Sequence, residues 1–311
     1  MNALPRLIAR LVAGEHLVVD DPDLRQPLLE LGADRTAAGE FVWPAAVAPL
    51  DSSLIEQGLE SEARAWLRSL EVLPAAGSTN SLLLERGSVG SIDGVVVTAE
   101  CQLEGRGRLG RRWLSPLGTN LAISIGLRLD VPPAELGGST LVVGLALLEA
   151  LDPEGLLGLS LKWPNDVFGP DGKLAGILVE LATHTHDATE LVIGIGINLA
   201  VPAVASDRVP QAVQNLYALP GAVHDRNRLL ASVVSAVVTF LTRFAESGFE
   251  PFVAAFNQHH RLQGRTCTVS GAGEARSGRV VGIDSQGGLL LETAAGTERV
   301  LSGELSIRVA E

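Results

Sequence analysis

Residues 159–199, LSLKWPNDVFGPDGKLAGILVELATHTHDATELVIGIGINL, decide the fold because they contain three β-rich runs separated by turns. The runs are Leu159–Trp163, Leu174–Leu181 and Leu191–Leu199. Leu, Ile and Val dominate them, and clusters of Gly, Pro, Asn and Asp lie between them. The stretch therefore predicts strands of a mostly buried sheet.

The flanking sequence adds strands and helices to this sheet. Two more β-rich runs and two helical runs surround it: Val95–Ala99, Leu121–Leu129, Thr140–Leu151 and Asp225–Ser247. Ser139 and Thr140 are expected to open the first helix, and Gly248 to end the second. The mixture predicts an α/β or α+β domain over residues 61–262.

The pattern changes after Gly264. Five short β-rich runs follow, separated by Gly, Ser or Asp turns: Thr266–Ser270, Gly278–Ile283, Leu289–Glu292, Arg299–Leu301 and Leu305–Val309. Five strands within so few residues predict a small barrel or sandwich. We place a domain boundary near residues 261–264 and assign residues 263–311 to this C-terminal domain.

Residues 1–60 form a third, acidic segment with 10 Asp or Glu and 4 Arg. It opens with apolar residues at helical spacing: Leu4, Leu7, Ile8, Leu11 and Val12. The remainder is rich in Pro and Asp, which predicts loops and a short strand rather than long helices.

The overall composition bounds the class of protein. The chain has 311 residues, 46% of them hydrophobic, and a net charge of −12, which argues against general binding to nucleic acid or to an anionic membrane. Cys101 and Cys267 cannot form a disulfide framework, and no apolar run approaches 18 residues. We expect a soluble cytoplasmic protein with no membrane partner.

Lysine is almost absent: the chain has 22 arginines but only Lys162 and Lys173. Both lie at strand ends beside turns rather than on a helix surface. A compact ammonium group beside a crowded anionic ligand cannot be exchanged for a planar guanidinium group. This placement favours a function for both lysines over the chance survival of two surface residues.

Residues 105–113, GRGRLGRRW, place four arginines in an otherwise acidic chain. The three glycines allow the backbone to approach a ligand closely. Such a loop can fold over an anion, donate backbone N–H groups and exclude water. A solvated Gly/Arg loop is the alternative, and the acidic remainder of the chain argues against non-specific RNA binding.

Two shorter motifs have both a structural and a functional interpretation. In KWPND, residues 162–166, Pro164 disfavours a helix and predicts a corner that presents the Lys, Asn and Asp side chains at a sheet edge. In GSTN, residues 77–80, the polar side chains precede a helical start at Ser81–Glu85. Helix capping alone would explain them, and contact with a ligand is the other interpretation.

Other signals do not predict a site. Residues 194–198, GIGIN, lack the third glycine of a dinucleotide fingerprint, and no G-x-x-x-x-G-K-[ST] loop occurs. His184, His186 and Asp187 lie in a polar connection without a further well-placed ligand, so we predict no protein-held metal. His259 and His260 are expected at a surface helix end, and no Ser-His-Asp or Cys-His set can be assembled.

Taken in order, the motifs resemble the biotin–protein ligases, in particular the bacterial biotin–[acetyl-CoA-carboxylase] ligases and the bifunctional ligase/repressor proteins. Five motifs match with family-like spacing: STN at 78–80, GRGRLGRRW at 105–113, KWPNDV at 162–167, KLAGILVE at 173–180 and GIGIN at 194–198. The segment from GRTCTV at 264–269 to GELSIR at 303–308 resembles that family's C-terminal barrel of the Src-homology-3 type. The resemblance covers about residues 66–311.

The resemblance implies an α+β fold: a mixed-sheet catalytic domain of the class II synthetase type, the C-terminal barrel and a short N-terminal domain that resembles a degenerate winged helix. It implies that biotin and ATP, with Mg²⁺, give biotinyl-5′-adenylate, and that biotin passes to a lysine of the biotin carboxyl carrier protein. The residues implied for biotin are Ser78, Thr79, Asn80, Gln102, Gly105, Arg106, Gly107, Arg108 and Lys173. Those implied for the nucleotide are Arg111, Trp113, Lys162, Asn165 and Asn198, with Lys173, Arg108 and Lys162 catalytic.

The sequence departs from the repressor type. A DNA-recognition helix should offer several basic side chains to phosphates, whereas residues 13–60 contain only Arg25 and Arg35. The charged Glu104, just before the Gly/Arg loop, stands where a small or neutral residue is expected. DNA binding is therefore disfavoured as a second function.

Two other functions remain as alternatives. A lipoate–protein ligase would share the sheet and the adenylation chemistry, but GRGR, KWPND and the C-terminal barrel favour biotin. A regulator that only senses biotin would not need both lysines. The oligomeric state, a homodimer included, stays open.

Overall fold

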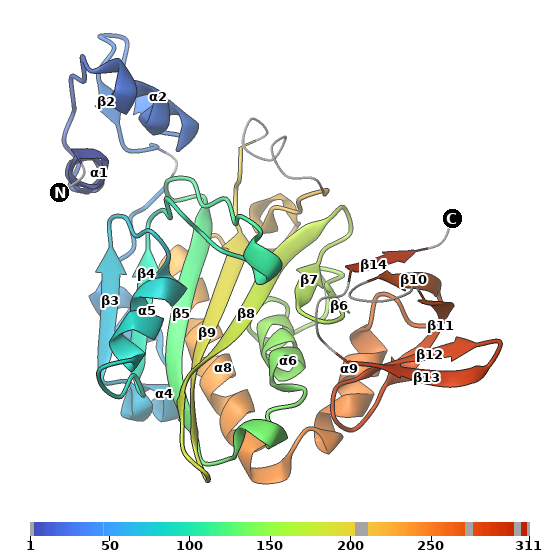
Figure 1. Ribbon diagram of the computed structural model, residues 1–311. Helices are drawn as coiled ribbons and strands as arrows, with labels where there is room; N and C mark the ends of the chain where they lie inside the picture. Colours follow the sequence, from blue (N-terminus) through green and yellow to red (C-terminus); the bar gives the residue numbers. More distant parts are fainter. Residues whose placement is uncertain (1–2, 46, 203–210, 271–275, 302–305, 310–311) are drawn as a thin grey trace.

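The computed structural model describes residues 3–45, 47–202, 211–270, 276–301 and 306–309. At its centre is a seven-stranded mixed sheet in the order β3-β4-β5-β9-β8-β7-β6 (Figure 1). Only β3 and β4 pair in parallel. The strands are β3 (Ser69–Leu73), β4 (Val95–Ala99), β5 (Asn120–Leu129), β6 (Ser160–Lys162), β7 (Asp166–Phe168), β8 (Lys173–His184) and β9 (Thr189–Asn198). The predicted α+β class is confirmed.

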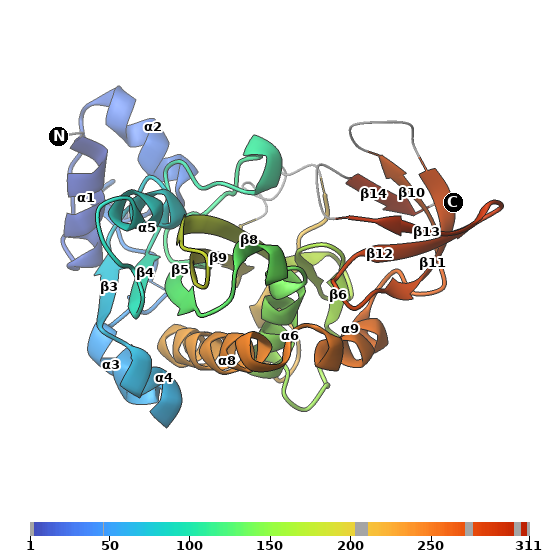
Figure 2. The same ribbon diagram turned by 60° about the horizontal axis from the view of Figure 1, so that its bottom comes forward.

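Helices cover the sheet unequally. The two long helices, α6 (Ser139–Leu151) and α8 (Arg226–Ser247), pack on one face, and α3 (Ser52–Gly58) and α4 (Ser61–Trp66) pack against α8 (Figure 2). On the other face, the described helices that pack are α5 (Thr79–Gly87) and the short η1 (Arg108–Gly110), which is part of the Gly/Arg loop. The two faces are thus covered by different numbers of long helices.

The ends of these helices only partly follow the predictions. Asp225 caps α8, because its carboxylate accepts from the backbone N–H groups of Asn227 and Arg228 at 2.9 and 3.1 Å. Ser139 does not cap α6. The cap residue is Gly138, whose φ of 86° lies in the left-handed region that glycine adopts without strain, and it supplies no side-chain bond.

The five predicted C-terminal strands are present, and they form an antiparallel sheet in the order β13-β12-β11-β10-β14. Its strands are β10 (Thr266–Ser270), β11 (Arg276–Ile283), β12 (Leu289–Thr293), β13 (Gly296–Val300) and β14 (Ser306–Val309); Leu305 lies outside the described residues. Its apolar side chains share one core with the central seven-stranded sheet. Trp163 Nε1 donates to Gly287 O at 2.9 Å across the junction.

The prediction for His260 is wrong. Whereas an exposed helix end was expected, His260 follows α9 (Val253–His259) and is 4% exposed. Its ring packs on Phe256 at 5.2 Å, and neither ring nitrogen has a hydrogen-bond partner among the described residues. Burial lowers the pKa of His260 to about 4, so the ring is neutral at physiological pH.

The N-terminal segment contains more helix than predicted. It forms α1 (Ala3–Val12), α2 (Pro22–Glu30) and a hairpin of β1 (Asp34–Arg35) and β2 (Phe41–Val42). The second helix was missed because two prolines suggested a loop, yet Pro22 lies at its first position, where no N–H is needed. Cys101 and Leu117 of the next domain complete its apolar core, and Leu117 N donates to Leu31 O at 2.8 Å.

Among the described residues, α8 is the one helix whose length and composition would allow it to cross a membrane. In this fold it packs along α6 and β5, and 56% of its apolar window is buried inside the protein. Its apolar character is accounted for by its place in the core.

Candidate active site

A cavity of about 410 Å³ opens on the face of the sheet that carries α5 and η1. It gathers twelve of the fourteen residues predicted for the site: Ser78, Thr79, Asn80, Gln102, Arg106, Gly107, Arg108, Arg111, Trp113, Asn165, Lys173 and Asn198. The floor is formed by β8 and β9, and the Gly/Arg loop contributes the opposite wall. Residues from five separate motifs thus meet in one place.

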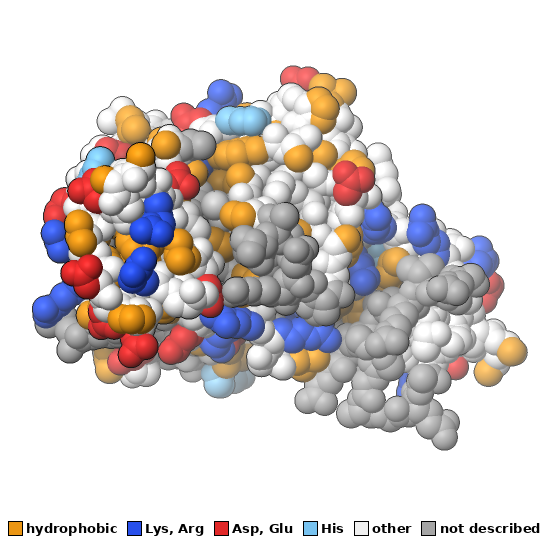
Figure 3. Space-filling model, turned by 90° about the horizontal axis from the view of Figure 1, so that it is seen from above, with side chains coloured by type: hydrophobic (Ala, Val, Ile, Leu, Met, Phe, Trp, Pro, Cys, Tyr) orange, Lys and Arg blue, Asp and Glu red, His pale blue; other side chains and the backbone are white. Residues whose placement is uncertain are grey.

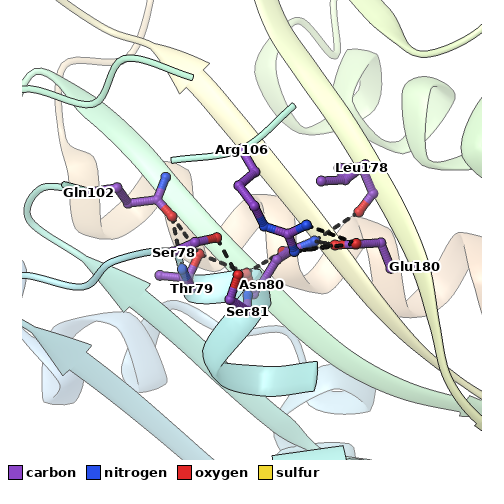
Figure 4. A network of polar contacts seen from close by, with 9 residues as sticks. Ser78, Thr79, Asn80, Ser81, Gln102, Arg106, Leu178 and Glu180 are labelled. Atoms are coloured by element: carbon purple, nitrogen blue, oxygen red, sulfur yellow. Dashed lines mark hydrogen bonds and ion pairs between the residues drawn. The ribbon is translucent and has the colours of Figure 1, made fainter. Parts of the chain in front are cut away.

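At one end, the start of α5 presents a polar cluster (Figure 4). Ser78 caps the helix by accepting from Ser81 N at 3.4 Å. The Gln102 amide oxygen accepts from both the backbone N and the hydroxyl of Thr79, at 2.9 and 3.2 Å. The capping and the ligand-binding interpretations of this motif are therefore compatible, because the capping residues also line the cavity.

Asn80 is held rigidly in this cluster. Its amide nitrogen donates to Leu178 O at 3.2 Å and to the Glu180 carboxylate at 2.9 Å, and its oxygen accepts from the Ser124 hydroxyl at 2.5 Å. Glu180 also forms an ion pair with Arg106 at 3.0 Å, which ties the Gly/Arg loop to β8 (Figure 4). The polar groups at this end are thus fixed before a ligand arrives.

The middle of the cavity carries the charged groups. Lys173 Nζ lies 2.6 Å from Asp166 Oδ1, and both side chains are less than a fifth exposed. Arg108 donates to Asn165 Oδ1 at 3.1 Å. Partial burial lowers the pKa of Arg108, although the Asp166 carboxylate acts in the opposite direction. The ammonium group of Lys173 and the guanidinium group of Arg108 therefore both line the cavity near the Asp166 carboxylate.

At the other end, the Trp113 ring lies against β8 and β9 at Gly176 and Gly196. Lys173 Nζ is 5.6 Å from the centre of this ring. Nearby, Asn198 donates to Lys173 O and accepts from Asn120 Nδ2, both at 3.0 Å. An aromatic plane flanked by amide groups suits the stacking and hydrogen bonding of a nucleobase.

Two predicted residues do not line the cavity. Lys162 Nζ lies 5.5 Å from the centre of the Phe168 ring, a ring that Arg261 also contacts, and burial lowers the pKa of this lysine. Gly105 is at the base of the loop, where its carbonyl accepts from Trp113 N at 2.8 Å. A Cβ at Gly105 would press on the Trp113 carbonyl, so the glycine shapes the loop.

Several residues of the cavity were not predicted from the sequence. Asp166 was placed at the sheet edge, but its pairing with Lys173 was not predicted. Ser124 and Glu180 do not line the cavity, and their contacts with Asn80, which does, were not predicted either. The glycines of GIGIN were dismissed as a nucleotide fingerprint, yet Gly194 and Gly196 form the floor. Their spacing of two, which puts both on one face of a strand, was the usable signal.

Comparison with known proteins agrees with this geometry. Residues 74–198 match the biotin/lipoate A/B protein ligase family, and residues 263–308 match the biotin protein ligase C-terminal domain. The bifunctional ligase/repressor BirA of Salmonella typhimurium is 37% identical over 289 residues, which are 92% of this chain and 88% of that protein. The chain belongs to the biotin protein ligases.

Further biotin protein ligases show the same relationship. The biotin–[acetyl-CoA-carboxylase] ligase of Mycobacterium tuberculosis is 34% identical over 83% of this chain and 95% of its own. The structure of the Aquifex aeolicus biotin protein ligase in complex with biotin and ATP covers 78% of this chain and 100% of its own, with a TM-score of 0.66 and 34% identity.

Proposed function

We propose that this chain activates biotin with ATP and transfers the biotinyl group to a lysine of the biotin carboxyl carrier protein of acetyl-CoA carboxylase. One observation carries the proposal: a single cavity joins a fixed polar end, a Lys173–Asp166 centre and an aromatic end at Trp113. The order of these features matches a ligand with a polar ring, a carboxylate and then a nucleotide. The names of the relatives support the same assignment.

The polar end suits the ureido ring of biotin. That ring offers one carbonyl acceptor and two N–H donors, and the cavity offers hydroxyl and amide groups from Ser78, Thr79, Asn80 and Gln102. Because Asn80 is already oriented by its neighbours, little side-chain entropy is lost on binding. Arg106 and Gly107 lie in the loop that would close over the bound ring.

The central cations suit adenylation. A biotin carboxylate oxygen attacks the α-phosphorus of ATP, and the bond to the bridging oxygen of pyrophosphate breaks. Since this step brings two anions together, Lys173 and Arg108 stabilise the transition state, each by about 2–4 kcal/mol if they act as preorganised donors do elsewhere. Asp166 keeps the Lys173 ammonium in position. The carrier amine then attacks the acyl carbon, and AMP leaves.

Magnesium would enter with the nucleotide. No group of three or more His, Cys, Asp or Glu that could hold a metal occurs in the described part of the chain. Asp166 is the carboxylate that lines the cavity, which fits Mg²⁺ held mainly by phosphate oxygens with one protein carboxylate nearby. Bound Mg²⁺ would neutralise phosphate charge, while Lys173, Arg108 and Asn165 position the reacting groups.

The test is ATP-dependent incorporation of labelled biotin into an apo biotin-carrier domain, with lipoate and its own carrier in a parallel reaction. We expect biotin to be incorporated and lipoate not. Transfer of lipoate instead would assign the chain to the other branch of its family. Binding of biotin without any transfer would support a biotin sensor and contradict the catalytic roles.

A further inference from the structure

One carboxylate just outside the cavity contacts both of the elements that enclose its polar end. Glu180 lies on β8, beyond the part of that strand that pairs with β7. Its Oε2 accepts from Asn80 Nδ2 at 2.9 Å and from the Arg106 guanidinium group at 3.0 Å (Figure 4). Asn80 belongs to the first turn of α5, and Arg106 to the Gly/Arg loop. Glu180 thus joins the helix to the loop through one side chain.

The Gly/Arg loop, residues 105–113, is a small hairpin with its own backbone bonds. Gly107 N donates to Arg111 O at 2.7 Å within it. Such bonds set the shape of the hairpin but not its distance from the sheet, which depends on side chains that reach across. Arg106 is one of these, because its guanidinium group contacts both carboxylate oxygens of Glu180, at 3.0 and 3.3 Å. The pair therefore holds the loop down on the face that carries the cavity.

The contacts of Glu180 require a carboxylate rather than any polar group. Both of its partners are donors, and an ionised carboxylate accepts through both oxygens. An amide at this position would have one acceptor oxygen. Because Arg106 contacts both oxygens, the NH2 group of the amide would face the guanidinium group in either orientation, whereas Asn80 contacts Oε2 alone and could keep its bond. Replacing the carboxylate by an amide therefore releases the loop selectively.

We propose that Glu180 is a positioning residue that holds the Gly/Arg loop closed and so controls how fast biotin and its adenylate enter and leave. The inference rests on the proposed function. Since the loop forms one wall of the cavity, its opening breaks the Arg106–Glu180 pair. The pair therefore slows passage in both directions. The charge of Arg106 is used in this pair, which leaves Lys173 and Arg108 to meet the reacting anions.

The test is Glu180→Gln in the full-length protein. Stopped-flow tryptophan fluorescence follows the binding of biotin and of preformed biotinyl-5′-adenylate, because Trp113 lines the cavity. We expect both ligands to dissociate about tenfold faster, the effect of losing one hydrogen-bonded charge pair. They should associate at least as fast as with the unsubstituted protein, whereas a misshapen site would bind them more slowly. Glu180→Asp keeps the charge, and the long Arg106 side chain can follow it, so slow dissociation should largely return.

Glu71→Gln is the matched control. Glu71 pairs with Arg86 at 2.8 Å and joins β3 to the last turn of α5, the same helix that carries Asn80 at its start. Both side chains of this pair are 37% exposed, and neither residue lines the cavity. Its loss should leave both rate constants unchanged. Unchanged rates in Glu180→Gln, slower association there, or an equal effect in Glu71→Gln would overturn the proposal.

A measurement without any ligand separates this inference from the proposed function. Trypsin cleaves after arginine, and the Gly/Arg loop contains four arginines. Because cleavage follows the population of the open loop, Glu180→Gln should speed it several-fold and Glu71→Gln should not. Faster cleavage would support the role of Glu180 even if the unsubstituted protein failed to transfer biotin, a failure that would overturn the ligase function alone. Unchanged cleavage of the loop in Glu180→Gln would contradict the role, whatever the activity.

Discussion

The ammonium group of Lys173 occupies a space that a guanidinium group does not fit. Its ammonium group lies between the Asp166 carboxylate, at 2.6 Å, and the Trp113 ring, above the bare backbone of Gly176. Lys173→Arg should lower adenylation about 10²–10³-fold, because the planar group cannot occupy the same point between carboxylate and phosphate. Pyrophosphate release would measure this loss. Near-normal release, with biotin binding intact, would contradict the assigned role.

Gly194 provides a second prediction at this scale. A methyl group there would collide with the Asn80 amide, which is already held by Ser124 and Glu180. Gly194→Ala should therefore weaken biotin binding about tenfold or more, equivalent to about 1.4 kcal/mol. Titration calorimetry with biotin measures this loss of affinity. Gly90→Ala is the control, since nothing lies within 4 Å of its new Cβ, and an equal effect there would refute the argument.

The site was largely predictable because its residues belong to short motifs of unusual composition. Arg108, Trp113 and Asn165 lie in such motifs and line the cavity. Lys162 also lies in one, but the side chain turns to Phe168, and alternation along a three-residue strand could not show which way it points. Glu180 could not be predicted, since its role depends on pairing with a loop 74 residues away.

At the scale of elements, the start of α8 is bonded to residues 48–50, which follow the β1–β2 hairpin. Arg226 forms a buried ion pair with Glu100 at 2.7 Å and donates to Ala48 O at 3.0 Å. Glu100 in turn accepts from Leu50 N at 2.5 Å. The pair thus joins residues 48–50, the end of β4 and the start of α8 at one point.

Breaking this pair should be costly. Arg226→Met should lower the free energy of unfolding by about 3–5 kcal/mol, because the Glu100 charge is left buried without its partner. The double variant Glu100→Gln with Arg226→Met should recover most of the loss. Urea denaturation measures the free energy of unfolding of the single and the double variant. Arg128→Met, which breaks an exposed pair with Asp130, should cost less than about 1 kcal/mol, and equal losses would contradict the role of burial.

The long helices were predicted well, and some of the shortest elements were missed. The sequence pattern predicts α6 and α8 each within one residue, because many side chains report one periodicity. The three-residue strand β7 and the six-residue helix α4 carry too few positions to show a period. They form because neighbouring elements supply partners that no local pattern encodes.

At the scale of the whole molecule, His260 sits at the junction of the catalytic and C-terminal domains. Residues beside it bridge the two, with Arg261 N donating to Leu161 O and Gly264 N donating to Val280 O. Since burial lowers the pKa of His260 from 6.5 to about 4, the unfolded chain binds a proton more readily than the folded one. This residue therefore stabilises the fold above pH 6.5 and loses that contribution as the pH falls toward 4.

The free energy of unfolding should thus fall by up to about 1.4 kcal/mol per pH unit between pH 6.5 and 4 through this one group. His260→Phe should remove the uptake of about one proton on unfolding and so reduce that slope by up to about 1.4 kcal/mol per pH unit. Denaturant titrations across this pH range measure the slope. His186→Gln, at an exposed side chain, is the control. An unchanged slope in His260→Phe would show that the ring binds its proton as readily in the folded protein as in the unfolded chain.

The N-terminal domain decides whether the molecule has a second function. One relative named ligase/repressor matches 92% of the chain, so the comparison alone leaves DNA binding open. The charged side chains of the N-terminal domain do not favour DNA binding. Of the basic residues in the first 60, Arg10 is paired with Glu15, and Arg35 is bonded to Gly39 O and lies over Phe41. On the face shown in Figure 3, acidic and basic side chains intermix over this domain.

Sequence-specific DNA binding requires several cations aligned on phosphates, and each neutralised phosphate adds to affinity through counterion release. We therefore expect the protein, loaded with biotin and ATP, to give no shift of its own biotin-operon promoter beyond that of unrelated DNA. A gel shift at low salt measures this, with the Salmonella relative on its own operator as the control. A shift that survives excess competitor DNA would overturn the expectation and assign the hairpin and α2 to a DNA interface.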